Sequence, residues 1–264
     1  GRMPDEVLRY ICSSCDIDPE EAIRSGNYVN LQDLAMLPNP FAPRLETLTP
    51  EPLLSKHLEQ APSLMEGIRR KDYLIHVPYY TYDYVVRLLM EAAISPDVSE
   101  IRLTQYRVAE NSSIISALEA AAQSGKKVSV FVELKARFDE ENNLRLSERM
   151  RRSGIRIVYS MPGLKVHAKT ALILYHTPAG ERPQGIALLS TGNFNETTAR
   201  IYSDTTLMTA NTDIVHDVYR LFRILDGDPE PARFSRLLVA RYNMGEAITN
   251  LIEREIENVK RGKR

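Results

Sequence analysis

The sequence has no tryptophan, only two cysteines and almost no net charge. Cys12 and Cys15 form a single C-x-x-C pair without a second pair or a nearby histidine, so they cannot complete a four-ligand zinc site. With 34 Lys and Arg against 35 Asp and Glu, the chain lacks the strongly basic balance of a protein that coats nucleic acid. We therefore expect no nucleic-acid partner.

Long apolar runs are also missing. No stretch of about 18 uncharged apolar residues occurs, and the longest run, at residues 171–175, has the length of a strand. The N-terminus carries no apolar segment typical of a secretory signal. We expect no membrane span and a cytoplasmic location, with peripheral membrane association as the alternative.

The rest of the composition is that of a globular protein, with 43% hydrophobic and 26% charged residues in a chain of 264. This length suits one or two domains. Five prolines fall within residues 38–52 and predict an irregular connector, since proline removes a backbone donor. Short helices are expected before it, one of them starting at Asp18 and Pro19. We place the domain boundaries at 1–52, 53–236 and 237–264.

From residue 73 onward, strand and helix patterns alternate. Hydrophobic periodicity predicts strands at 73–77, 98–108, 128–134 and 155–159, with helices at 83–94, 112–124 and 139–153 between them. Strands at 166–175, 186–190 and 204–208 and helices at 213–225 and 246–260 follow. This order predicts an α/β fold: a mixed, largely parallel sheet with helices on both faces, preceded by a short helical segment.

The densest chemical signal is the segment 162–169. If it is a strand, Lys165, His167 and Lys169 share one face, because side chains alternate along a strand. Two ammonium groups beside an imidazole form an anion site, and they lower the imidazole pKa and so keep it neutral and nucleophilic. The plainer alternative is a solvated edge strand with a chance histidine.

A second element, residues 190–196, follows the next strand. Its Gly192 allows the backbone to approach an anion closely, and Asn193 and Asn195 can donate to phosphate oxygens. The alternative is an ordinary Asn/Gly turn.

Taken together, His167-x-Lys169 followed by Gly192-x-x-Asn195 resembles the phosphotransfer site of the phospholipase D superfamily. The fuller motif of that superfamily has an aspartate five residues after the lysine, where this chain has Leu174. This departure speaks against a standard phosphodiesterase.

Polyphosphate kinases built on phospholipase D-like halves share the departure, and residues 72–209 resemble them closely. The resemblance rests on six blocks in the same order, at 76–80, 106–109, 125–128, 132–140, 162–169 and 191–204. It implies that His167 is phosphorylated by ATP and passes the phosphoryl group to the end of an inorganic polyphosphate chain, reversibly. Lys165 and Lys169 are its expected catalytic neighbours.

The resemblance also implies a nucleotide site. Arg107 and Arg137 match two arginines at Mg²⁺-bound phosphates, and Tyr202 matches a tyrosine at the nucleotide, with Asn193 and Asn195 as further ATP-binding residues. Both arginines follow predicted strands, where α/β sheets bind ligands, and a guanidinium holds phosphate with two hydrogen bonds. Mg²⁺ is the implied cofactor, but arginine cannot bind a cation, so no direct ligand can be named.

Three carboxylates, those of Glu133, Glu196 and Asp204, are candidates to orient His167, and the sequence does not choose among them. His76 is equally consistent with a site role and with packing.

Members of the resembling family are longer than this chain. The resemblance implies that residues 1–52 are the tail of a preceding head domain, 53–236 the first phospholipase D-like half, and 237–264 the truncated start of the second half. It also implies a homo-oligomer for the full-length enzyme and weak or absent turnover by this chain alone. The alternatives are a phospholipase D-type phosphodiesterase or nuclease, and a non-catalytic module that binds polyanions.

Overall fold

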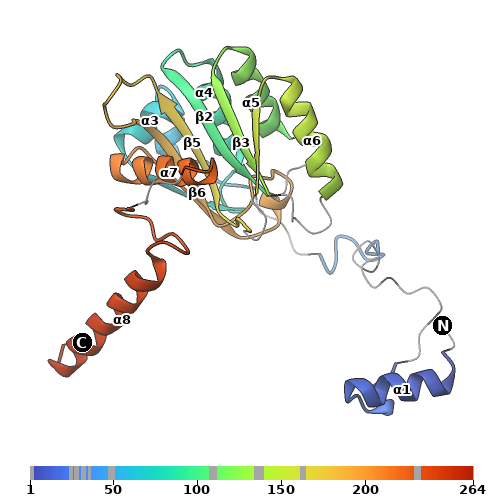
Figure 1. Cartoon of the computed structure of the whole chain (residues 1–264). Helices are drawn as coiled ribbons and strands as arrows, with labels where there is room; N and C mark the ends of the chain where they lie inside the picture. The colour runs from blue at the N-terminus through green and yellow to red at the C-terminus, as the bar shows by residue number, and fades with distance from the viewer. Residues whose placement is uncertain are drawn as a thin grey trace. The chain divides into compact units, whose positions relative to one another are not determined.

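The computed structural model (Figure 1) describes residues 3–23, 26, 30, 34, 37–46, 51–106, 112–133, 140–160, 165–228 and 233–263, without the side chains of 140–142. The chain divides into two compact units, Gly1–Thr49 and Pro50–Arg264. The boundaries expected at 52/53 and 236/237 stay predictions.

The first unit contains two short helical elements, α1 (Asp5–Cys15) and η1 (Pro19–Glu21). Asp18 caps η1 as expected: its side chain accepts from the backbone N–H of Glu20, and the Glu21 side chain accepts from the backbone N–H of Asp18. Proline at the first position loses no helical hydrogen bond there. Cys12 is buried and Cys15 exposed, and both are free thiols.

The second unit alternates helices and strands. Its elements are α2 (Lys56–Glu59), α3 (Leu64–Arg70), β1 (Tyr73–Val77), α4 (Asp83–Ile94), β2 (Val98–Gln105), α5 (Ser113–Gln123), β3 (Lys127–Val132), α6 (Glu140–Arg152), β4 (Arg156–Tyr159), β5 (Lys169–Tyr175), β6 (Gly185–Ser190), η3 (Thr198–Arg200), β7 (Asp204–Thr209), α7 (Thr212–Leu225) and α8 (Met244–Lys260). The predicted α/β class is confirmed.

The strands form one seven-stranded sheet in the order β1-β7-β6-β5-β2-β3-β4. The predicted mixed sheet is confirmed, but the expectation that it is largely parallel is wrong. Only β2–β3 and β3–β4 are parallel, whereas β1–β7, β7–β6, β6–β5 and β5–β2 are antiparallel. The physical reason is that the β5–β6 hairpin pairs with β2, and β1 pairs with β7 at the far edge rather than with β2.

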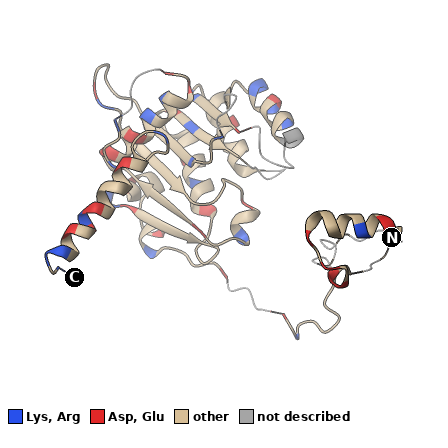
Figure 2. Cartoon of the chain, turned by 60° about the horizontal axis from the view of Figure 1, so that its bottom comes forward, with Lys and Arg blue, Asp and Glu red and all other residues tan. Residues whose placement is uncertain are grey.

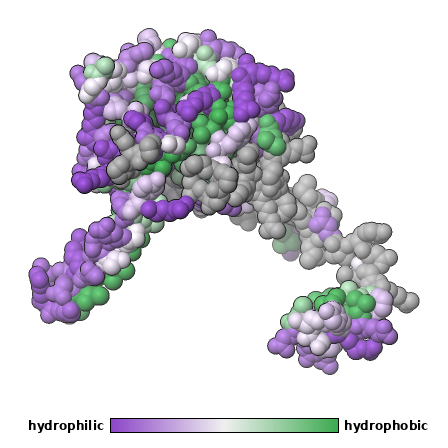
Figure 3. All heavy atoms as spheres, viewed as in Figure 1, coloured by the Kyte–Doolittle hydropathy of each residue, from purple (hydrophilic) through white to green (hydrophobic). Residues whose placement is uncertain are grey.

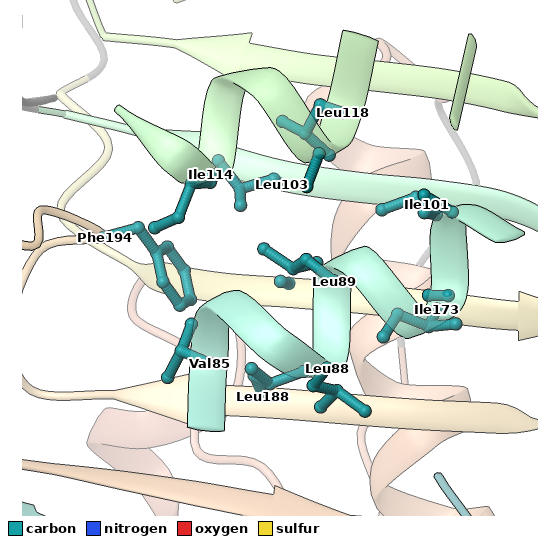
Figure 4. Packing of buried hydrophobic residues seen from close by; sticks show 14 of the residues in the cluster. Val85, Leu88, Leu89, Ile101, Leu103, Ile114, Leu118, Ile173, Leu188 and Phe194 are labelled. Carbon is teal, nitrogen blue, oxygen red and sulfur yellow. The ribbon is translucent and has the colours of Figure 1, made fainter. Parts of the chain in front are cut away.

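Helices cover both faces of the sheet, as predicted. The larger core packs α3, α4 and α5 on one face, and Figure 4 shows the side chains of α4 and α5 meeting those of β2, β5 and β6. Leu88, Leu89, Ile101 and Leu118 are fully buried there. The smaller core packs Val215, Val218 and Phe222 of α7 against β3, β5 and β6 on the other face.

Helix α8 is amphipathic, and none of its residues is buried. Figure 3 shows apolar side chains along one side of it, and Figure 2 shows acidic and basic residues interspersed along its length. In the part of the chain that the structure describes, no helix has the length and apolar character needed to cross a membrane.

Candidate active site

His167 lies in the segment that leads into β5. The expected strand over 166–175 begins only at Lys169, and residues 165–168 have no regular structure. The ladder of β5 with β6 ends at the pair Lys169 and Ser190, so the preceding residues have no strand partner. The prediction that Lys165, His167 and Lys169 lie on one face of a strand is therefore wrong, because residues 165–168 are not part of a strand.

These three side chains nevertheless meet, and they meet around Tyr106. The His167 and Tyr106 rings contact each other nearly perpendicularly, with centroids 5.4 Å apart. The ammonium of Lys169 lies 5.0 Å, and that of Lys165 5.7 Å, from the centroid of the same tyrosine ring. Tyr106 follows directly after β2, so a central strand brings it to His167. From the sequence, Tyr106 belongs to the block at 106–109 that resembles polyphosphate kinases, and no role was expected of it.

The two lysines differ in environment. Lys169 is 8% exposed, and its Nζ donates to the backbone carbonyl of His167 at 2.7 Å. Burial lowers the pKa of Lys169, the charge of Asp204 opposes this shift, and Lys165 adds to it. Lys165 and His167 are exposed. The ammonium of Lys169 is thus fixed by a hydrogen bond to the backbone, whereas Lys165 is exposed to solvent.

The pKa of His167 lies below its ordinary value, first because of burial and then because of the charges on Lys169 and Lys165. The imidazole is therefore neutral at neutral pH, which is the nucleophilic form. Among the described residues, the ring of His167 packs against that of Tyr106.

Each candidate carboxylate has another partner. The Glu133 side chain accepts from the backbone N–H of Val166 at 2.8 Å and from the Ser160 hydroxyl at 3.1 Å, so it holds the backbone just before His167. Glu196 accepts from the Ser112 hydroxyl at 2.9 Å and the Ile114 backbone N–H at 3.1 Å, at the start of α5.

The third carboxylate, that of Asp204, lies so close to the backbone of residue 192 that only glycine fits there without a shift. A Cβ at Gly192 would come within 2.8 Å of the Asp204 Cβ and closer still to its carboxylate. The Thr191 hydroxyl donates to the same carboxylate at 2.8 Å. The anion that approaches this glycine is the chain's own aspartate.

The two asparagines differ. Asn195 is buried, and its Oδ1 accepts from the backbone N–H groups of Thr197 and Thr198 at 3.0 Å, in the turn that leads into η3. Asn193 Oδ1 is buried and has no hydrogen-bond partner among the residues that the structure describes. Tyr202 is 62% exposed just before β7. Arg107 and Arg137 lie outside the described residues.

His76 is exposed, and its Nδ1 lies 3.1 Å from the Thr205 hydroxyl, while its ring stacks on Tyr79 at 5.2 Å. A hollow of about 380 Å³ lies on the sheet beside Lys169. Polar Ser190, Thr191 and Thr205 and four leucines line it as well.

The described residues contain no group of three or more His, Cys, Asp or Glu side chains that could hold a metal ion. The charges around His167 are ammonium groups, which suit phosphate oxygens and repel a bare cation.

Comparisons with known proteins agree with this geometry. Residues 63–231 match the family model of the polyphosphate kinase C-terminal domain 1. The chain is 35% identical to the polyphosphate kinase of Vibrio vulnificus strain YJ016 over 99% of its length, and 37% identical to that of Escherichia coli K12 over 98%. It spans 37% and 38% of those two relatives.

A solved polyphosphate kinase structure gives the same result. The polyphosphate kinase of Porphyromonas gingivalis is 98% identical and superposes with a TM-score of 0.86 over 100% of this chain and 40% of that one. Nuc from Salmonella typhimurium, a phospholipase D family member, aligns at 15% identity with a TM-score of 0.47 over 62% of this chain and 98% of its own. Because the family model covers more than half of the chain, the chain belongs to the polyphosphate kinase family.

Proposed function

We propose that this chain carries the phosphoryl-accepting histidine of an ATP:polyphosphate phosphotransferase. The observation that supports this most directly is the exposed imidazole of His167, whose pKa is lowered and which lies beside two ammonium groups on the Tyr106 ring. A neutral imidazole has a free lone pair for attack on phosphorus, and the ammonium groups neutralise charge on the transferring phosphoryl group.

The reaction has two steps. A ring nitrogen of His167 attacks the γ-phosphorus of ATP, an N–P bond forms, the bond between that phosphorus and the bridging oxygen breaks, and ADP leaves. A terminal oxygen of polyphosphate then attacks the same phosphorus, the N–P bond breaks, and the chain is one unit longer. In reverse, His167 takes the terminal phosphoryl group of polyphosphate, and ADP then accepts this group from His167 and becomes ATP.

The remaining residues bind and orient. Lys165 and Lys169 hold the oxygens of the transferring group, and Arg107 and Arg137 hold neighbouring phosphates bidentately. Tyr202, with its exposed ring, contacts the nucleotide together with Asn193 and Asn195. Mg²⁺ enters on the ATP phosphates and neutralises their charge.

Several properties concern the whole enzyme. ATP, ADP and inorganic polyphosphate are the proposed ligands, in a homo-oligomer located in the cytoplasm. Because the relatives are more than twice as long as this chain, we expect slow or absent turnover without their further residues.

The test is the intact mass of the chain after incubation with Mg-ATP and, separately, with polyphosphate. We expect one acid-labile phosphate on the wild type and none on His167→Ala. His176→Ala is the matched control, since His176 is exposed beyond the other end of β5, and it should be phosphorylated like the wild type.

Unchanged phosphorylation of His167→Ala would refute the assignment of the nucleophile. If the protein at its full natural length binds polyphosphate with a steep salt dependence but gains no phosphate, the function is polyanion binding alone.

A further inference from the structure

The Tyr106 side chain contacts all three groups of the proposed phosphotransfer site. Its ring meets His167 at 5.4 Å between centroids and lies under Lys169 and Lys165 at 5.0 and 5.7 Å. An aromatic face attracts cations within about 6 Å of its centroid. The Tyr106 ring thus contacts two ammonium groups, which repel each other, and it also contacts the imidazole of His167.

The position of this ring is well supported. Tyr106 directly follows β2, which pairs with β3 on one side and β5 on the other. Its backbone carbonyl accepts from the side chain of Asn143, which is 0% exposed on α6. The ring is therefore held by a central strand and a helix, whereas His167 and Lys165 lie in an irregular segment.

The contact also leaves the ammonium donors available. An ammonium has three N–H donors, and a cation–π contact uses none of them in a strong hydrogen bond. One N–H of the Lys169 ammonium donates to the backbone carbonyl of His167. A carboxylate in the place of the ring would bind these donors and would compete with phosphate oxygens.

We propose that Tyr106 is a positioning residue for phosphoryl transfer: its aromatic face holds Lys165 and Lys169, and its ring orients the His167 imidazole. This inference rests on the proposed function of His167. The phenol hydroxyl has no part in it, so the aromatic face alone carries the effect.

The test compares Tyr106→Phe and Tyr106→Leu in the protein at its full natural length, with phosphohistidine formation from Mg-ATP as the readout. Tyr106→Phe keeps the face, and we expect its rate within about threefold of the wild type. Tyr106→Leu lacks the face, and we expect kcat to fall by about tenfold or more with little change in KM for ATP, because orientation rather than binding is lost. A higher KM for ATP with an unchanged kcat in Tyr106→Leu would overturn the proposal.

Tyr175→Leu is the matched control. Tyr175 is a partly buried tyrosine at the other end of β5, with the Arg69 guanidinium 4.2 Å from its centroid. We expect it to lose stability without a change in kcat. An equal loss of kcat in Tyr175→Leu and Tyr106→Leu would show a general packing effect and overturn the proposal.

Fluorinated phenylalanines at position 106 keep the test valid even if Tyr106→Leu does not fold. Each added fluorine weakens the negative face of the ring with little change in shape, so the rate should fall stepwise with fluorine number. A rate independent of fluorination refutes the role of Tyr106 and leaves the proposed function intact. A His167→Gln variant that is still phosphorylated, or a wild type that is not, refutes the proposed function and this inference with it.

Discussion

Replacing Gly192 by alanine tests whether the close approach of Asp204 shapes the loop beside the site. The added Cβ would lie 2.8 Å from the Asp204 Cβ and nearer to its carboxylate, a separation that real Cβ atoms do not tolerate. Gly192 does not adopt a left-handed conformation, so the substitution brings steric conflict without backbone strain. Asp204 must move, and the hydrogen bond from the Thr191 hydroxyl at 2.8 Å is lost with it.

The expected cost follows from these two effects. Overpacking by one methyl group costs about 1–3 kcal/mol. The exposed hydrogen bond between Thr191 and Asp204 adds roughly 0.5–1.5 kcal/mol. We therefore expect Gly192→Ala to lower the free energy of unfolding by about 1.5–4.5 kcal/mol, which lowers the Tm of a chain of this size by roughly 2–4 °C for each kcal/mol.

Thermal and urea unfolding measure this cost, and two further variants isolate its cause. Gly245→Ala is the control, because no atom lies within 4 Å of a Cβ built there, and it should be neutral or stabilising. Asp204→Ala removes the carboxylate, so the double variant should be less destabilised than the sum of the single ones by about 1 kcal/mol. A change below about 0.5 kcal/mol for Gly192→Ala, or strict additivity in the cycle, would refute the steric argument.

Three more predictions follow from the contacts around the site and α7. In a pH–rate profile, the acid limb of phosphohistidine formation should lie below the ordinary imidazole pKa, because burial and then the charges of Lys169 and Lys165 lower the pKa of His167. Lys165→Gln removes one of these charges and should move the acid limb to higher pH. A move to lower pH would contradict this prediction. Glu133→Gln weakens the acceptor of the Val166 N–H, so it should lower the free energy of unfolding in urea by about 1–3 kcal/mol and speed amide hydrogen exchange at Val166. Unchanged exchange at Val166 would show that Glu133 does not hold this backbone segment. Asp217 is 0% exposed and accepts from three consecutive backbone N–H groups at 235–237, so Asp217→Asn should lower the free energy of unfolding by about 1.5–3 kcal/mol, with wild-type thermal stability as the contrary result.

The helices and strands could be predicted well because their signals are local. The predicted helix at 83–94 coincides with α4, in which Tyr84, Val85, Leu88, Leu89 and Ala92 recur at helical spacing and are buried. The strand order could not be predicted in this way. β1 pairs with β7, more than 120 residues away, and nothing in either strand's own pattern specifies that partner.

The candidate site shows the same division. His167 and its lysines stand out in the sequence, because a histidine between two lysines is a local pattern. Tyr106 does not stand out, because its contacts with His167 and Lys169 cross about 60 residues of chain and exist only through the pairing of β2 with β5. The approach of Asp204 to Gly192 does not stand out either, because it depends on the pairing of β6 with β7.

Leu174 offers a test between phosphotransfer and phosphodiester cleavage. It stands where the phospholipase D motif has an aspartate, and in this fold it is 6% exposed in the core that packs α7 on the sheet, beside Phe222 and Val218. A carboxylate there would be buried among apolar side chains without a partner, which costs several kcal/mol, about 3–5 by analogy with a broken buried ion pair. We expect Leu174→Asp to unfold or to melt far below the wild type without gaining phosphodiesterase activity, whereas Leu174→Met should cost less than about 1.5 kcal/mol. A stable Leu174→Asp protein that cleaves a phosphodiester would refute this expectation and would show that the core under α7 accommodates a carboxylate at position 174.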